Sequence, residues 1–243
     1  MTICDYSGIA DYYEKWSSGD VAYAAAASFY LSFLDRYEGV FAELGVGTGR
    51  IAIPASMRRG VKIYGVDKCD EMLKQCRLHM AENANLELIN ADFMTFELPR
   101  KADIIYMPFR TIGHIMTEGA LKNFFQCVYR NLKENGLFVF DHYIFNLEWA
   151  KSHDKTDILM YRDDSVSISD KYIYDFEAGK MYCTVSVNGR AAVNFDFRWI
   201  STDEIQGIYP ECGFFLEALL GDFDGSFWTP QSKNQIWVLR RPG

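Results

Sequence analysis

Short apolar runs alternate with amphipathic helical stretches through the first 150 residues of the chain. The apolar runs predict buried strands at 40–46, 62–67, 86–92, 104–107 and 137–140. The clearest helical pattern, which Asn135-Gly136 is expected to end, has its apolar stripe at Leu121, Phe124, Phe125, Val128 and Leu132. Strands that alternate with helices predict a parallel sheet with helices on both faces.

The pattern changes after about residue 155, where apolar and polar residues begin to alternate. The alternation predicts strands at 169–176, 181–187 and 191–197, with a tight hairpin turn at Asn188-Gly189. This antiparallel meander would have one apolar face, which must pack either on the parallel sheet or on another subunit in a homodimer. A short helix from Asp203 and two last strands at 214–220 and 235–240 complete the expected elements.

The composition supports one domain with a substantial core. The chain has 243 residues, of which 49% are apolar and 24% are charged, so neither disulfides nor a metal is needed to hold the fold. No repeat or Pro/Gly-rich linker divides it. We therefore expect a single domain over residues 1–243, with N-terminal lid helices in 1–39 and an antiparallel β insertion at 155–199.

Charge and cysteine content exclude several classes of partner. The net charge of −8 argues against a nucleic-acid partner. No stretch of 18 apolar residues occurs, which argues against a membrane span, and the N-terminus does not resemble a signal peptide. The six cysteines show no disulfide-like pairing and no metal-type spacing with the four histidines. The sequence therefore predicts a cytoplasmic protein without a metal.

Three glycines stand at the end of the first predicted strand, at Gly45, Gly47 and Gly49. Glycines at this point let the backbone turn sharply and approach a ligand, while the next helix directs its free N–H groups at that ligand. The dinucleotide fingerprint has a further glycine where this chain has Arg50. The pyrophosphate interpretation is therefore disfavoured, and no Gly-Lys-Ser/Thr follows to make a phosphate loop.

Acidic residues end the second and third predicted strands. Asp67 stands 18 residues after Gly49, and Asp92 is followed by Phe93. The first carboxylate could accept hydrogen bonds from a ribose diol and the second from the exocyclic amine of a purine. The alternative for both is a structural helix cap. Because parallel strands end at one edge of a sheet, we expect these acids and the glycine loop to form one ligand site.

These segments resemble class I S-adenosylmethionine-dependent methyltransferases. The resemblance rests on 43–49, 65–67, 71–73 and 91–93, in that order. It implies an α/β fold, a Rossmann-like seven-stranded sheet with helices on both faces, in which 235–240 is the final antiparallel strand. It also implies that S-adenosyl-L-methionine is the cofactor.

The same resemblance implies which residues contact that cofactor. The glycine loop would lie against its amino-acid part, Asp67 would hold the ribose and Asp92 the adenine amine. Further cofactor contacts implied around these positions are Glu43, Lys68, Met72, Ala91, Phe93 and Met107. Tyr13 and Trp16, three positions apart on one helix face, are expected to form a lid that excludes water from the sulfonium.

A narrower resemblance is to small-molecule N-methyltransferases, including amino-sugar N,N-dimethyltransferases. Residues 10–14 are similar to a segment that places a tyrosine, here Tyr13, over the cofactor. Residues 109–114 resemble their Phe-Ser-Ser-Ile-Gly-His segment, whose histidine faces the substrate amine, here His114. Arg110 departs from that pattern and is predicted to contact substrate.

Two histidines are candidates for the chemistry. An amine that arrives protonated must lose a proton before it attacks a methyl group, and histidine is the natural acceptor near neutral pH. His114 is therefore predicted to be catalytic, as base or as substrate positioner, together with Tyr13. His142 follows the fifth strand and is predicted to contact substrate. The alternative for both histidines is a structural role in the core.

The sequence thus favours methyl transfer from S-adenosyl-L-methionine to a small molecule, with nitrogen the expected acceptor. The alternatives are transfer to oxygen and a non-catalytic protein that only binds the cofactor. A nicotinamide-dependent oxidoreductase is disfavoured by Arg50 and by the acidic Glu43 before the loop.

Overall fold

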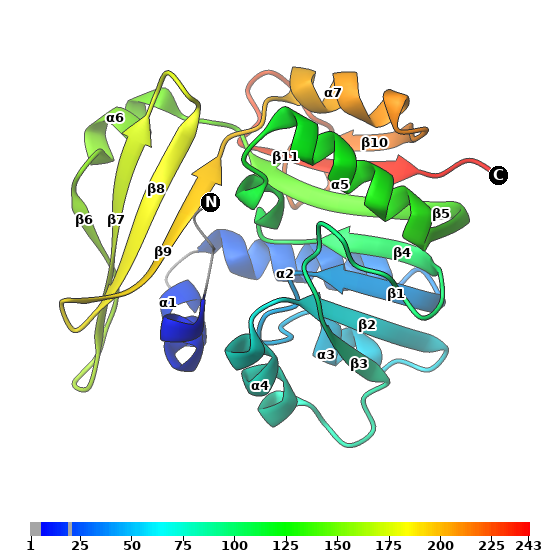
Figure 1. Cartoon of the computed structure of the whole chain (residues 1–243), viewed down its shortest axis with the longest axis horizontal. Coiled ribbons are helices and arrows are strands. Elements are labelled where there is room, and N and C mark those ends of the chain that lie inside the picture. The colour runs from blue at the N-terminus through cyan, green and yellow to red at the C-terminus, as the bar shows by residue number, and fades with distance from the viewer. Residues whose placement is uncertain (1–5, 19–20) are drawn as a thin grey trace.

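The computed structural model describes residues 6–18 and 21–243. Its larger sheet has seven strands in the order β10-β11-β5-β4-β1-β2-β3 (Figure 1). Strands β1 to β5 pair in parallel, whereas β11 runs antiparallel to both β5 and β10. The strands are β1 (Gly39–Leu44), β2 (Val61–Asp67), β3 (Leu86–Asn90), β4 (Ala102–Met107), β5 (Leu132–Tyr143), β10 (Phe215–Leu220) and β11 (Asn234–Arg240).

Helices cover both faces of this sheet because successive strand residues point to opposite faces. In β1, Ala42 packs in the cluster with helices α5 and α7, while its neighbour Phe41 packs in the cluster with α2, α3 and α4. The helices are η1 (Ser7–Tyr12), α1 (Tyr13–Ser18), α2 (Val21–Leu34), α3 (Ala52–Ser56), α4 (Asp70–His79), η2 (Thr111–His114), α5 (Glu118–Asn131), α6 (Leu147–His153) and α7 (Thr202–Glu211). The predicted methyltransferase sheet is confirmed.

One boundary differs from the sequence prediction. Helix α5 ends at Asn131, not at Asn135-Gly136, and Leu132 already begins β5. The side-chain amide of Asn131 donates to the carbonyl of Cys127 at 3.0 Å and accepts the backbone N–H of Leu98 at 2.9 Å, which anchors the helix end. Asn135 instead adopts a left-handed conformation, with φ of 62°, inside the early part of β5.

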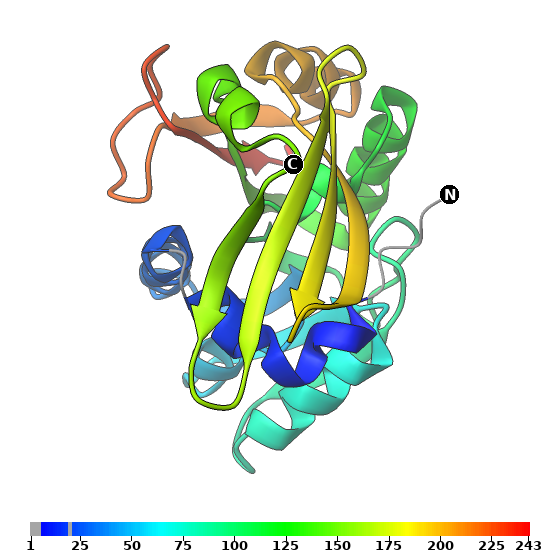
Figure 2. The ribbon, with the colours of Figure 1, turned by 90° about the vertical axis from the view of Figure 1, so that its left-hand side faces the viewer.

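A second, four-stranded antiparallel sheet is formed by β6 (Asp157–Arg162), β7 (Ser167–Asp175), β8 (Lys180–Val187) and β9 (Arg190–Arg198). The alternation predicted the last three, but β6 and helix α6 were missed. Figures 1 and 2 show this sheet standing across the carboxyl ends of the parallel strands, with the N-terminal segment (residues 6–18) beside it.

The apolar face of the four-stranded sheet is buried within the same chain. Ile9 and Trp16 of the N-terminal segment pack with Ile168, Val185 and Phe195 of the sheet. A second subunit is therefore not required to cover this face. The two predicted options for it were the parallel sheet and another subunit, and the structure adds a third element, the N-terminal segment.

The sequence also predicted that the cysteines are not paired in disulfides and that no segment spans a membrane. Cys69, Cys76, Cys127, Cys183 and Cys212 are buried, whereas Cys4 and residues 19–20 of the predicted lid lie outside the described residues. Within the described part of the chain, every helix is too short or too polar to cross a bilayer.

Candidate active site at the carboxyl edge of the sheet

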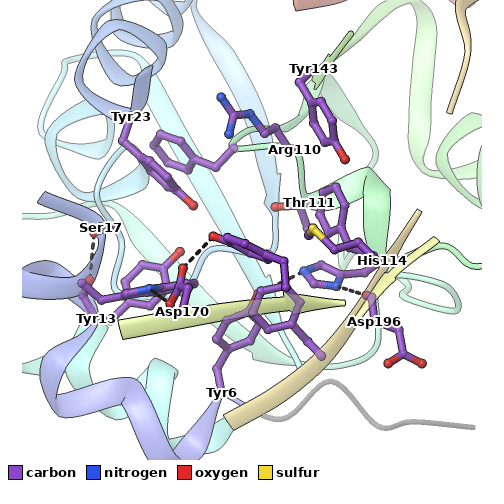
Figure 3. Close-up of a pocket in the computed structure, with 18 of the residues that line it drawn as sticks. Tyr6, Tyr13, Ser17, Tyr23, Arg110, Thr111, His114, Tyr143, Asp170 and Asp196 are labelled. Carbon is purple, nitrogen blue, oxygen red and sulfur yellow. Dashed lines mark hydrogen bonds between the residues drawn. The ribbon is translucent and has the colours of Figure 1, made fainter. Parts of the chain in front are cut away.

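A cavity of about 510 Å³ lies where the parallel strands end (Figure 3). The loops after β1, β2, β3 and β4 line one part of it, and the four-stranded sheet lines another. The segment from the end of β5 into α6 (residues 143–150), the N-terminal segment and Tyr23 of α2 contribute the remaining wall. This is the crevice at which open α/β sheets bind ligands, and its size suits small molecules.

Asp67 is fixed at the edge of the cavity by the glycine loop. Its two carboxylate oxygens accept the backbone N–H groups of Gly47 and Cys69, each at 2.9 Å. Burial raises the pKa of the Asp67 carboxyl, and these two hydrogen bonds oppose that rise. The carboxylate retains acceptor positions beyond these two bonds, and Asp67 lines the cavity.

The three positions in the loop require glycine for different physical reasons. All adopt left-handed conformations, with φ of 72° at Gly45, 53° at Gly47 and 86° at Gly49. A Cβ on Gly45 would lie 2.8 Å from Cγ2 of Thr111, inside the loop that lines the cavity. A Cβ on Gly49 would lie 2.6 Å from Sγ of Cys76. Gly45 and Gly47 line the cavity, whereas Gly49 lets the loop pack closely against α4.

Glu43 supports the loop from behind. It is buried and is not among the residues that line the cavity. Its carboxyl accepts the Tyr106 hydroxyl at 2.9 Å, and burial raises its pKa to about 8. The acid before the glycines, predicted to contact the cofactor, therefore lies one layer beneath the cavity surface.

The residues predicted to surround an adenine gather at one end. Lys68, Met72, Asp92 and Phe93 all line the cavity. Asp92 also accepts the backbone N–H of Met94 at 2.8 Å, so its cap role and its position at the cavity coexist. Ala91 is not among the lining residues; its backbone N–H donates to the Asp67 carbonyl at 3.0 Å.

The N-terminal segment is joined to the glycine loop by polar contacts. Glu14 accepts the Thr48 hydroxyl at 2.5 Å and Nη2 of Arg50 at 2.8 Å, and Arg50 also donates to the Ser17 hydroxyl. These contacts bring Tyr13 and Trp16 to the cavity wall, with their ring centroids 5.5 Å apart. Burial raises the pKa of the Tyr13 hydroxyl well above its usual value.

His114, at the end of η2, has both ring nitrogens engaged. Its Nδ1 lies 3.1 Å from the backbone carbonyl of Asp196, which can only accept, so Nδ1 carries the proton. Its Nε2 then accepts the Tyr6 hydroxyl at 3.1 Å. Burial lowers the pKa of His114 to about 4. The ring is therefore neutral near pH 7 and presents a fixed acceptor to the cavity.

Arg110 lies in a strained loop beside this histidine. Phe109 and Arg110 both have positive φ, 60° and 62°, and their backbone N–H groups donate to the Asp141 carboxylate at 2.9 and 3.0 Å. Two consecutive non-glycine residues in this conformation are costly and are held by the surrounding structure. Asp141 is itself fixed by the Tyr30 hydroxyl at 2.7 Å. The guanidinium lies 5.7 Å from the Tyr143 ring centroid, and both residues line the cavity.

Two further predicted contacts, besides Glu43, Gly49 and Ala91, lie outside the cavity lining. His142 is fully buried, its Nε2 accepts the backbone N–H of Ile200 at 3.1 Å, and burial lowers its pKa to about 3. It stacks on Phe197, which does line the cavity. Met107 is also fully buried. Alternation along β4 and β5 points these two side chains into the core, and only the tertiary fold reveals which face that is.

Several residues that line the cavity were not predicted from the sequence. They are Tyr6, three aromatic residues between the end of β5 and α6 (Tyr143, Phe145 and Trp149), and side chains of the four-stranded sheet, among them Met160, Asp170, Tyr172, Tyr174, Met181, Phe195 and Phe197. The aromatic richness of 169–176 was the available signal. From the sequence alone it left the meander as either a substrate wall or a subunit interface, because the meander's position was unknown.

Comparison with known proteins agrees with this geometry. Residues 41–136, which contain the glycine loop, Asp67, Asp92 and His114, match the model of a methyltransferase domain. The chain therefore contains a methyltransferase domain. YqeM of Bacillus subtilis (strain 168), a protein named as a methyltransferase, is 24% identical over 217 residues, covering 84% of this chain and 85% of YqeM.

Two solved structures share the fold of this chain. An S-adenosylmethionine-dependent methyltransferase from Clostridium acetobutylicum ATCC 824 is 18% identical, with a TM-score of 0.75 over 98% of this chain and 99% of its own. CalS10 of Micromonospora echinaspora, an amino pentose methyltransferase solved with S-adenosylmethionine, is 16% identical, with a TM-score of 0.66 over 94% of this chain and 96% of its own. At these identities the likeness concerns the fold.

Proposed function

We propose that this enzyme methylates a nitrogen atom of a small-molecule amine. The observation that supports this proposal is that one cavity is lined both by the glycine loop and by aromatic residues of the four-stranded sheet. A cavity with these two ends holds a cofactor and an acceptor side by side. Proximity and orientation of two bound reactants supply much of the rate of such a transfer.

The cofactor fits the end at the glycine loop. Asp67 offers a carboxylate for the ribose diol, and Asp92 offers one for the adenine amine, beside the Phe93 ring. Gly45 and Gly47 present bare backbone, which an amino-acid moiety can approach closely. When bound, S-adenosylmethionine supplies an electrophilic methyl group on its sulfonium. Tyr13 and Trp16 form the wall that excludes water from this end.

His114 positions the acceptor in this proposal. Its neutral ring offers the Nε2 lone pair, which an amine N–H can use in place of the Tyr6 hydroxyl. With a pKa of about 4 it is a poor store for the proton of an ammonium ion near pH 7. The Asp196 carbonyl fixes the tautomer and so keeps this acceptor on the cavity side.

The four-stranded sheet supports a small acceptor. It stands across the ends of the parallel strands (Figure 2). With the N-terminal segment, it lines the cavity between them. The amino pentose acceptor in the name of CalS10 favours an amine among small molecules. Sites on folded proteins or long nucleic acids are disfavoured, because they would have to thread beneath this sheet.

A methyl-transfer screen with labelled S-adenosylmethionine tests the proposal. Matched pairs of amine and alcohol, identical except for the reacting atom, should show label transferred to the amine. Transfer to alcohols or phenols alone would establish the oxygen alternative. Cofactor binding without transfer to any member of a broad panel would favour a non-catalytic protein.

A further inference from the structure

Asp170 is a buried acid on the wall that the four-stranded sheet contributes to the cavity. It lies on β7 and is 1% exposed, yet it lines the cavity, where Figure 3 shows it among the other lining side chains. Its Oδ1 accepts Nε1–H of Trp16 at 2.8 Å, and its Oδ2 accepts the Tyr172 hydroxyl at 2.7 Å. Both partners donate, so the geometry is that of an ionised carboxylate.

No cation balances this carboxylate among residues 6–18 and 21–243. Trp16 and Tyr172 are neutral, and the ion pairs within the described residues do not include Asp170. Burial raises its pKa to about 6, which leaves it mostly ionised at pH 7. A buried charge is costly unless it is paired, and a carboxylate has about four acceptor positions, two of which are used here.

The surroundings of Asp170 suit an organic cation. Helix α6 and the four-stranded sheet line the cavity with the rings of Trp149, Tyr172 and Tyr174 and the thioethers of Met160 and Met181. Aromatic faces attract cations, and apolar walls strengthen an ion pair between them. The cavity's own cations, Lys68 and Arg110, belong to the loops after β2 and β4, and neither is ion-paired with Asp170.

We propose that Asp170 is the recognition residue for the ammonium form of the methyl acceptor. The acceptor would be a primary or secondary amine on a planar or apolar body that fits the aromatic walls. This inference rests on the proposed nitrogen acceptor and adds its charge state. Binding as the ammonium ion and reaction as the free amine are compatible, because the nitrogen has only to pass one proton to the adjacent carboxylate before it attacks.

Binding of two isosteric probes tests this assignment in the full chain. Benzylammonium chloride and benzyl alcohol differ in charge but little in shape, and both can be titrated by calorimetry in the presence of S-adenosylhomocysteine. We expect the wild-type protein to prefer benzylammonium by about tenfold or more at pH 7.5. Asp170→Asn should abolish this preference while leaving benzyl alcohol binding within about twofold.

Control measurements separate recognition from support of the fold. Asp157→Asn removes the same charge from the exposed edge strand β6 and should keep the wild-type preference. The amide in Asp170→Asn can still bond Trp16 or Tyr172, so S-adenosylhomocysteine affinity should be retained. Loss of that affinity together with equal loss of both probes would show a structural role and overturn the inference, as would an unchanged benzylammonium preference.

The outcome is distinguishable from failure of the proposed function. If the screen finds amine acceptors and Asp170→Asn leaves their KM unchanged, only the assignment of Asp170 is wrong. If label goes to oxygen alone, nitrogen methylation itself is wrong. A KM for amines that rises about tenfold in Asp170→Asn, with the KM in Asp157→Asn unchanged, supports both.

Discussion

Arg50 donates from Nη2 to the Glu14 carboxylate at 2.8 Å, joining the N-terminal segment to the loop after β1. Arg50 occupies the position at which the dinucleotide fingerprint has a further glycine. Arg50, which disfavoured pyrophosphate binding, therefore has a structural role of its own: its side chain is hydrogen-bonded to the segment that carries Tyr13 and Trp16. The same carboxylate accepts the Thr48 hydroxyl at 2.5 Å.

We expect Glu14→Gln to weaken S-adenosylmethionine binding several-fold with little effect on the fold. The carboxyl side chain is 51% exposed, so the pair with Arg50 contributes at most about 1 kcal/mol to the free energy of unfolding. Calorimetry gives the affinity and urea denaturation the stability. Glu38→Gln, an exposed acid before β1 at the opposite edge of the sheet, is the matched control. Equal affinities for Glu14→Gln and wild type would contradict the role of this contact.

Asp67→Asn should reduce S-adenosylmethionine affinity by between about tenfold and a hundredfold, since a hydrogen bond to a charged group typically contributes 1.5–3 kcal/mol. The amide oxygen can replace only part of the acceptor set that now serves Gly47, Cys69 and a ribose. Asp70→Asn, an exposed acid at the start of α4, should bind the cofactor as the wild type does. NAD titrated in parallel should give no heat, and heat with NAD alone would refute the methyltransferase site.

Gly45→Ala should destabilise the protein by about 1–3 kcal/mol and impair cofactor binding, because φ of 72° strains any side chain there. Its Cβ would also lie 2.8 Å from Thr111, which would shift the lining of the cavity. Gly207→Ala in the middle of α7 meets nothing within 4 Å and should stabilise the protein by up to about 1 kcal/mol. Chemical denaturation of both variants measures the contrast. If Gly45→Ala leaves the free energy of unfolding unchanged, the loop adjusts to the added methyl group and the prediction is wrong.

Protonation of His114 should lower the free energy of unfolding as the pH decreases. Its folded pKa of about 4 lies below the ordinary value of 6.5, so the unfolded chain binds the extra proton first. The contribution is fully present above about pH 6.5 and is lost as the pH falls toward 4; at pH 4.5 the loss is about 2–3 kcal/mol. Buried acids with raised pKa, such as Asp170 and Glu43, act in the opposite direction.

Because those acids oppose it, the effect of His114 is measured as a difference. The free energy of unfolding of the wild type and of His114→Gln is compared at pH 7 and pH 4.5. The variant should lose about 2–3 kcal/mol less than the wild type over this interval. His79→Gln, a substitution on the surface of α4, should behave as the wild type. Parallel pH dependences in wild type and His114→Gln would show that the ring is not held neutral.

The parallel sheet was predictable because its signals are local. Apolar runs and the glycines of the first loop determine strands and turns whatever lies nearby, and the chain order then fixes the edge at which Asp67 and Asp92 meet. The strand β6 was missed because its residues are mostly half-exposed or exposed, and an edge strand needs no strong apolar alternation.

The chain's sequence by itself determined the seven-stranded sheet, and it predicted the cofactor class and most of the residues that line the cavity beside the glycine loop. The tertiary structure decided which side chains face the cavity: Glu43, Met107 and His142 point into the core, while Tyr6 and Asp170 arrive from segments more than 100 residues apart. The physical reason is that a strand's period of two defines two faces but not which of them is buried. That choice depends on the packing of the four-stranded sheet and the N-terminal segment across the ends of the parallel strands.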